Sequence, residues 1–80
     1  MLNIKVLGTS CPNCIRLENI CREVVAENNL EATVEKVTNI DDFWKYGVML
    51  TPALVVNGRL LVQGKLPTKY TLAHWLMNNH

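Results

Sequence analysis

Two cysteines separated by two residues are the side chains with the clearest capacity for chemistry in this chain. They lie in the segment GTSCPNC, residues 8–14, as Cys11 and Cys14. Two close thiols can interconvert with a disulfide or bind a soft metal ion, and free cysteine is also a common core residue. The rest of the sequence must decide among a redox couple, a metal site and packing.

The position of the pair favours redox chemistry. A short apolar run over residues 2–7 ends at Gly8, and a helical pattern starts at Pro12, whose fixed φ suits the first position of a helix. Cys11 would then face free backbone N–H groups and the positive end of the helix dipole, which favour the thiolate that attacks disulfides. Cys14 follows one turn later, close enough to resolve a mixed disulfide. This geometry predicts that Cys11 attacks and Cys14 resolves.

Zinc binding and core packing explain the pair less well. A structural zinc site normally has four ligands, yet the chain has no second C-x-x-C pair, and His74 and His80 lie far along the sequence. Cys21 follows Cys14 by seven residues, about 10 Å along a helix, whereas a disulfide needs Cα atoms within roughly 7 Å. We therefore expect no bound metal, and we expect Cys21 to pack in the apolar stripe of the helix.

Composition indicates a single small domain over residues 1–80. Hydrophobic residues make up 49% of the chain and charged residues 19%, which excludes a disordered chain. The net charge of +1, with acids and bases interspersed, gives no electrostatic reason to bind nucleic acid or an anionic membrane. The N-terminal MLNIKVL is too short and too polar for a signal peptide or a membrane span. We expect a cytoplasmic monomer.

Local patterns predict a βαβ unit in the first half of the chain. Residues 2–7 and 32–37 are rich in apolar and β-branched side chains and are expected to form strands. The helix between them, from about residue 12 to 28, carries apolar residues at helical spacing. A return through this helix makes the two strands parallel, with a right-handed crossover.

A short helix, a hairpin and a last helix are expected to follow. Thr38 is the predicted cap of the short helix, which carries Ile40 and Phe43 on one apolar face and stops at Gly47. The segment TPALVVNGRLLVQG has two apolar runs around Asn-Gly, the pair favoured in type I′ hairpin turns. With a helix over about 68–78, the order is β-α-β-α-β-β-α. We expect an α/β fold with a four-stranded mixed sheet and three helices.

This arrangement resembles the thioredoxin/glutaredoxin superfamily, and most of all its small prokaryotic members with a redox-active disulfide. The likeness covers the whole chain and depends most on CPNC together with Thr51-Pro52 at the entry of the hairpin. It implies that Pro52 is a cis-proline against the active-site disulfide and that Thr51 pairs with the backbone of an extended substrate. Gly64 matches a glycine that keeps the substrate groove open. Pro12 and Asn13 complete the candidate substrate contacts.

The resemblance implies a thiol–disulfide oxidoreductase that reduces protein disulfides, binds no cofactor and is recharged by an upstream disulfide reductase. Three features depart from the family. Ser10 stands where thioredoxins have tryptophan before the motif, and Lys5 stands where they have a buried acid, which leaves water to accept the Cys14 proton. After the hairpin, QGKLP lacks the glycine pair and the acid of glutaredoxins, so we expect weak glutathione binding.

A binding module is the alternative from another class. The segment from Gly8 into the first helix also resembles the start of the heavy-metal-associated domain, which carries copper(I) between two cysteines, here Cys11 and Cys14. Thr9 stands where that family has methionine, and the expected second and last helices do not match its fold. In either case Trp44 and Tyr46 are candidates for an exposed partner-binding patch.

Overall fold

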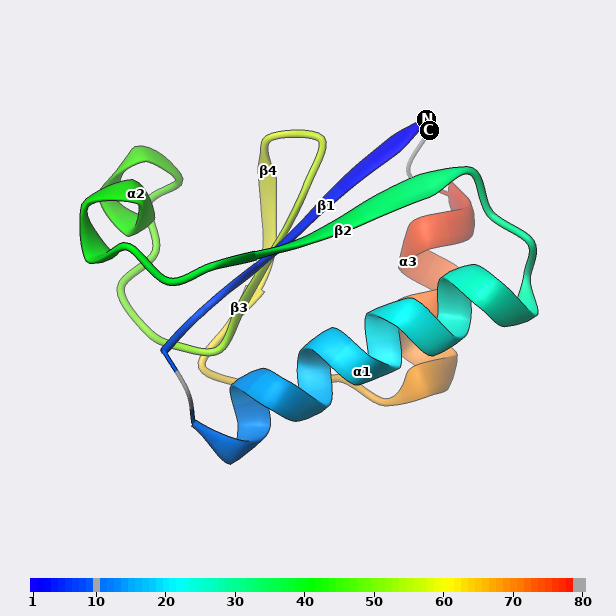
Figure 1. Cartoon of the computed structure of the whole chain (residues 1–80), viewed down its shortest axis with the longest axis horizontal. Coiled ribbons are helices and arrows are strands. Elements are labelled where there is room, and N and C mark those ends of the chain that lie inside the picture. Colours follow the sequence, from blue (N-terminus) through cyan, green and yellow to red (C-terminus); the bar gives the residue numbers. More distant parts are fainter. Residues whose placement is uncertain (10, 79–80) are drawn as a thin grey trace.

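The computed structural model describes residues 1–9 and 11–78, so Ser10 and His80 lie outside the described residues. Seven elements are present in these ranges, four strands that form one mixed sheet and three helices that pack on it (Figure 1). In chain order they are β1 (Leu2–Leu7), α1 (Pro12–Glu27), β2 (Ala32–Val37), α2 (Ile40–Lys45), β3 (Ala53–Val56), β4 (Arg59–Gln63) and α3 (Lys69–Asn78). The expected element order and the α/β fold are confirmed. No helix within the described ranges is long and apolar enough to cross a membrane.

The order of the strands brings distant parts of the chain to one end of the sheet. The order is β2-β1-β3-β4, with β1 parallel to β2 and β3 antiparallel to both of its neighbours. Leu7, at the end of β1, therefore pairs with Val37 on one side and with Ala53, the first residue of β3, on the other. Because Ala53 directly follows Thr51-Pro52, the sheet places that dipeptide beside the segment that leads from β1 into α1.

Helices cover the two faces of the sheet unequally. Figure 1 shows α1 and α3 together on one side of the strands and α2 on the other. Leu2, Ile4 and Val6 of β1 are buried under α1 and α3, whereas Leu7 joins a smaller cluster with Phe43 of α2. The alternation of side chains along β1 explains this division, since successive residues of a strand point to opposite faces.

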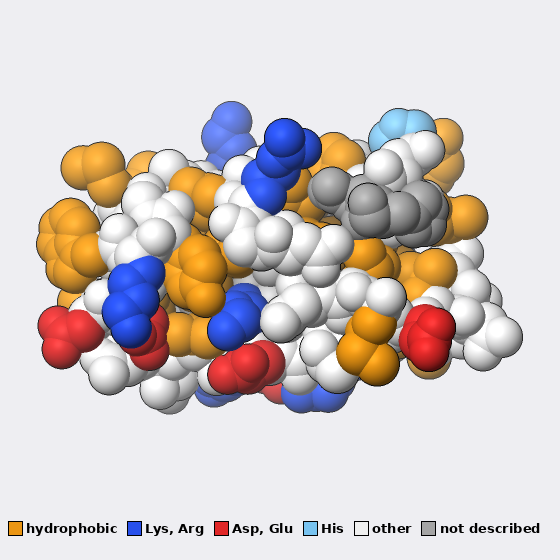
Figure 2. Space-filling view, turned by 90° about the horizontal axis from the view of Figure 1, so that it is seen from above, with side chains coloured by type: hydrophobic (Ala, Val, Ile, Leu, Met, Phe, Trp, Pro, Cys, Tyr) orange, Lys and Arg blue, Asp and Glu red, His pale blue; other side chains and the backbone are white. Residues whose placement is uncertain are grey.

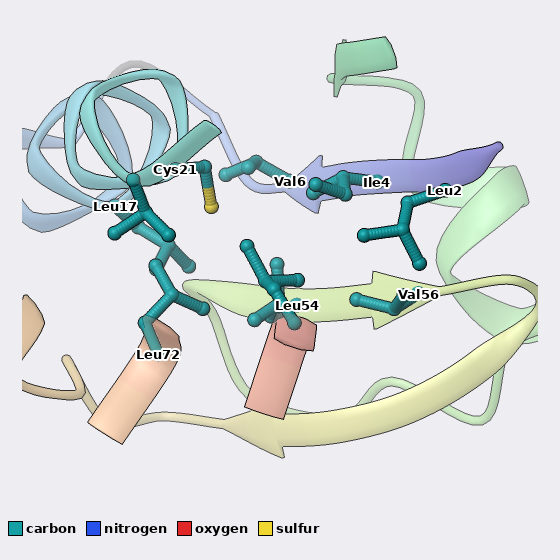
Figure 3. Close-up of a cluster of buried hydrophobic side chains, with 10 residues drawn as sticks. Leu2, Ile4, Val6, Leu17, Cys21, Leu54, Val56 and Leu72 are labelled. Carbon is teal, nitrogen blue, oxygen red and sulfur yellow. The ribbon is translucent and has the colours of Figure 1, made fainter. Parts of the chain in front are cut away.

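Cys21 belongs to the larger of the two cores. Its side chain is fully buried and its thiol is free, and Figure 3 shows the sulfur directed from α1 into the hydrophobic cluster that contains Val6 and Leu54. Burial disfavours the thiolate and raises the pKa of Cys21 from 9.0 to about 12. The prediction that Cys21 is a packing residue is confirmed.

Helix α2 begins one residue later than predicted. Asn39, not Thr38, is the N-cap, because its side-chain oxygen accepts the N–H of Asp41 at 3.0 Å. Of Ile40 and Phe43, which were expected on one apolar face, only Phe43 is buried, whereas Ile40 is 59% exposed. Ile40 is the first of the six residues of α2, and Phe43, one turn later, is the residue that packs into the smaller core.

The turns follow the predicted chemistry. Gly47 has a φ of +73° directly after the last residues of α2, which confirms the expected left-handed stop. Asn57 and Gly58 have φ values of +52° and +82°, so both central residues of the hairpin turn are left-handed, as a type I′ turn requires.

Candidate active site

The pair of cysteines forms a disulfide at the start of α1. Cys11 and Cys14 are bonded through their sulfurs, with their Cα atoms 5.2 Å apart. Cys11 is the N-cap of the helix, and its Sγ accepts the backbone N–H of Cys14 at 3.1 Å. Pro12 occupies the first helical position, where a missing N–H costs nothing. The sulfur of Cys11 therefore lies where the unpaired N–H groups and the helix dipole favour negative charge.

The two sulfurs differ in their access to solvent. Cys14 is buried, with 1% of its surface exposed, and Cys11 is half-buried. Pro12 and Asn13, the residues between them, are exposed. An incoming disulfide can thus reach Cys11 without any rearrangement of the core, whereas Cys14 is shielded behind it.

Gly8 also belongs to this site, although the sequence pattern indicated only that it ends the first strand. It is buried, and its N–H donates to the Val37 carbonyl at 3.0 Å. A Cβ atom at Gly8 would overlap the Cys14 sulfur and would lie 3.2 Å from Cys14 Cβ and 3.7 Å from Thr51 Cβ. The backbone at Gly8 therefore packs directly against the inner sulfur of the disulfide, and Thr51 lies close to the same point. The sequence signal that could have indicated this contact is a glycine three residues before the C-x-x-C motif.

The predicted substrate residues of the hairpin lie at the same end of the sheet. The peptide bond between Thr51 and Pro52 is cis, Thr51 is exposed and Pro52 is buried. Gly64 donates its N–H to the Pro52 carbonyl at 2.9 Å, and its φ of +72° lies in the left-handed region. A Cβ at Gly64 would come within 3.0 Å of two side-chain atoms of Leu50. The structure thus places Thr51 beside Gly8, which borders the Cys14 sulfur, and joins Gly64 to Pro52 by a hydrogen bond.

No acidic group lies beneath the disulfide in the described part of the chain, where no polar or charged residue is buried. Lys5, which stands where thioredoxins have an acid, directs its ammonium to Glu35 at 3.7 Å and over the Tyr46 ring at 5.8 Å from the centroid. A polar interaction with Tyr46, and then the Glu35 charge, raises the pKa of Lys5. The side chain of Lys5 is therefore engaged on the α2 face, away from α1.

The expected aromatic patch is only partly formed. Trp44 is exposed, but Tyr46 is half-buried and packs against the smaller core. Figure 2 shows hydrophobic side chains at the surface of the end of the molecule that carries α2, and the exposed ones there include Trp44 and Ile40.

The described residues of the site provide two cysteine sulfurs and no cluster of side chains typical of a metal centre. Within residues 1–9 and 11–78 no group of three or more histidine, cysteine, aspartate or glutamate side chains is placed to hold a metal ion. The sulfurs of Cys11 and Cys14 are joined to each other, and in that form they are not copper(I) ligands. The chain also ends its described part in helix α3. What the arrangement can do chemically is exchange a disulfide for two thiols.

Comparison with known proteins agrees with this chemistry. A family model described as a thioredoxin domain matches residues 2–77. The chain is 36% identical over 69 residues to a thioredoxin of Methanothermobacter thermautotrophicus, covering 86% of this chain and 90% of that protein. It is 28% identical over 68 residues to a thioredoxin of Methanocaldococcus jannaschii, covering 85% and 78% of the two chains.

Solved structures show the same fold at lower identity. Deadhead, a germline-specific thioredoxin of Drosophila melanogaster, superposes with a TM-score of 0.71 at 17% identity, over 99% of this chain and 81% of the other. A mutant thioredoxin from Halobacterium salinarum superposes with a TM-score of 0.65 at 23% identity, over 91% and 69%. These similarities concern the arrangement of the backbone.

Proposed function

We propose a two-step dithiol mechanism for this chain, which belongs to the thioredoxin domain family and is a thiol–disulfide oxidoreductase. In the reduced protein the Cys11 thiolate attacks one sulfur of a protein disulfide, and the other substrate sulfur leaves as a thiolate. Cys14 then attacks the Cys11 sulfur, the mixed disulfide breaks, and the second substrate thiolate leaves. Two electrons pass to the substrate, and the Cys11–Cys14 disulfide remains.

The observation that carries this assignment is the position of Cys11 as the N-cap of α1. Its Sγ accepts the Cys14 N–H, and a thiolate there would be stabilised by the same donor and by the helix dipole. Cys11 is also the more accessible sulfur, while Cys14 is buried behind it. These two features support Cys11 as the nucleophile and Cys14 as the resolving thiol.

The proton of Cys14 must leave before this thiol attacks. No buried carboxylate is present in the described ranges to accept it. We propose that water reaching the half-buried Cys11 side of the site takes this proton, directly or through the departing substrate thiolate.

Substrate binding is proposed to use the exposed rim around Cys11. Thr51 would pair its backbone with an extended substrate segment, and Pro52 lacks an N–H that could compete for it. Pro12 and Asn13 would contact the substrate from the helix side. Gly64, whose Cβ would meet Leu50, would keep the groove open.

The partners that fit this mechanism are protein disulfides and an upstream disulfide reductase, as the family suggests. We propose a cytoplasmic monomer that forms one domain over residues 1–80 and works without cofactor, nucleic acid or membrane. The family match over residues 2–77 supports the single domain. Light scattering after gel filtration should give a mass of about one chain, and a dimer at micromolar concentration would contradict the monomer.

Trapping of the mixed disulfide tests the two cysteine roles. With Cys14→Ser, an oxidised protein substrate such as insulin should accumulate as a covalent adduct on Cys11, because nothing resolves it. With Cys11→Ser, little adduct should form, because the remaining thiol of the pair is buried. Cys21→Ala is the matched control and should turn over normally. Equal trapping by both serine variants, or loss of turnover in a folded Cys21→Ala, would contradict the assignment.

A further inference from the structure

Gln63, the last residue of β4, holds the loop that leads to Thr51 and Pro52. Its side-chain oxygen accepts two backbone N–H groups, from Met49 at 2.7 Å and from Leu50 at 3.1 Å. Both distances lie within the normal range for such bonds, and together they use both lone pairs of the amide oxygen. One side chain therefore fixes two successive residues of the loop.

Backbone hydrogen bonds attach the end of β4 to the same loop at a second place. Gly64 donates its N–H to the Pro52 carbonyl, and Ala53, the next residue, pairs with Gln63 across the hairpin. Residues 49–52 are thus attached to residues 63–64 at both of their ends. Thr51 is the residue between the two attachments.

Residues 49–51 of this loop cannot be positioned by burial of their own side chains. Met49 is 78% exposed, Leu50 is 60% exposed and Thr51 is also exposed. A segment with few buried apolar contacts opens easily unless hydrogen bonds restrain it. The Leu50 side chain lies over Gly64, where a Cβ would come within 3.0 Å of two of its atoms, so the close approach is helped by the glycine as well. Val48, directly before the loop, is buried and donates its N–H to the Phe43 carbonyl, and the hydrogen bonds of Gln63 restrain the two residues between Val48 and Thr51.

We infer that Gln63 is a positioning residue for polypeptide substrates. Its carbonyl holds Met49 and Leu50 so that the backbone of Thr51 is presented beside the disulfide in a fixed geometry. This inference rests on the dithiol mechanism proposed above. It adds Gln63 as a residue that acts on substrate binding through the position of Thr51. It applies to substrates that have a backbone to pair with Thr51. A small disulfide that reaches Cys11 alone has no such backbone.

The test compares two substitutions with two substrates. Gln63→Leu removes the acceptor and leaves an uncharged side chain of comparable volume, whereas Gln63→Glu keeps an acceptor oxygen at the same reach. For each variant, kcat/KM is measured with insulin and with hydroxyethyl disulfide, a small uncharged disulfide. The readout is the ratio of the two kcat/KM values. A general change in the reactivity of Cys11 acts on both substrates and cancels in this ratio, and this includes a change caused by the added charge of glutamate.

Gln63→Leu should lower the insulin-to-small-disulfide ratio roughly tenfold, chiefly through KM, a factor that corresponds to about 1.4 kcal/mol. Gln63→Glu should restore most of the ratio. Asn28→Leu is the matched control, since it removes another side-chain clamp on the backbone, the 3.0 Å bond to the Val24 carbonyl at the far end of α1. That variant should lose stability and keep the ratio. An unchanged ratio in Gln63→Leu, or a glutamate variant as poor as the leucine variant, would overturn the inference.

Hydrogen exchange of the wild-type protein keeps the inference testable if Gln63→Leu does not fold. The amides of Met49 and Leu50 should exchange at least tenfold more slowly than an unprotected amide, because Gln63 accepts both. Exchange at the unprotected rate would overturn the inference. Failure of the dithiol mechanism gives a different result, since wild-type protein would then reduce neither substrate while these amides stay protected.

Discussion

Replacement of Gly8 by alanine tests whether the backbone before the disulfide is packed against the buried sulfur. Gly8 is not among the glycines with positive φ, so its conformation suits alanine, and without a collision the change would stabilise the protein by about 0.4–1 kcal/mol. The new methyl carbon, however, would overlap Cys14 Sγ and lie 3.2 Å from Cys14 Cβ, inside the roughly 3.5–4.0 Å of a good contact. Overpacking of this kind costs about 1–3 kcal/mol.

The collision should outweigh the gain, so we expect a net loss of about 1 kcal/mol and a Tm lower by roughly 4–8 °C. Urea and thermal unfolding of the oxidised protein measure both quantities. In a Cys14→Ala background the sulfur is gone, and the penalty of Gly8→Ala should fall by more than about 0.5 kcal/mol. Gly47→Ala is the control, because no atom beyond its own residue and its chain neighbours lies within 4 Å of its Cβ position and its strain comes from a φ of +73°. Its cost should be the same in both backgrounds.

Gly8→Ala would refute this reasoning if it left stability unchanged or increased it. The reasoning would also fail if the loss were equally large without the Cys14 sulfur, because the collision would then involve some other group.

Three further predictions concern stability. Because Asn39 caps α2, Asn39→Ala should lower the free energy of unfolding in urea by about 1 kcal/mol, and Thr38→Ala should lower it much less. Equal losses in the two variants would contradict Asn39 as the cap. Because the pKa of Cys21 is about 12 when folded and 9.0 when exposed, the unfolded thiol ionises first, so stability should fall as pH rises from 9 to 12. The stability of Cys21→Ala should fall less steeply over this pH range than that of the wild type. Identical slopes in the two proteins would contradict the prediction. Lys69→Ala removes ion pairs to two glutamates of α1, so its Tm deficit should shrink in 1 M NaCl, and a salt-independent deficit would speak against these pairs.

The order of elements was predictable because its signals are local. The change from strand to helix at Pro12, the Asn57-Gly58 turn and the left-handed Gly47 each depend on residues that are neighbours in the sequence. The same applies to Cys11 as the residue before the first helical turn, from which its place as N-cap follows. The choice between Thr38 and Asn39 as a cap was harder, because both residue types cap helices well and β2 ends only one residue earlier.

The parts of the site that could not be predicted depend on contacts between separate segments. Gly8 touches Cys14 and approaches Thr51 only because β3 runs antiparallel to β1. Gln63 reaches the N–H groups of Met49 and Leu50 across 14 and 13 residues of sequence, respectively. No periodicity or motif marks a glutamine for such a role. The first contact comes from the pairing of β3 with β1, and the second from the return of β4 to the loop that precedes β3.

A count of free thiols across a series of redox buffers tests the dithiol mechanism most directly. The protein is equilibrated from reducing dithiothreitol to oxidised glutathione, and its free thiols are alkylated under denaturing conditions and located by mass spectrometry. Cys11 and Cys14 should lose and regain their thiols together at one midpoint, while Cys21 stays a free thiol throughout, as its burial demands. A midpoint near the roughly −270 mV of thioredoxins would indicate a reductant of protein disulfides. If no reversible bond formed between Cys11 and Cys14, the mechanism would be wrong.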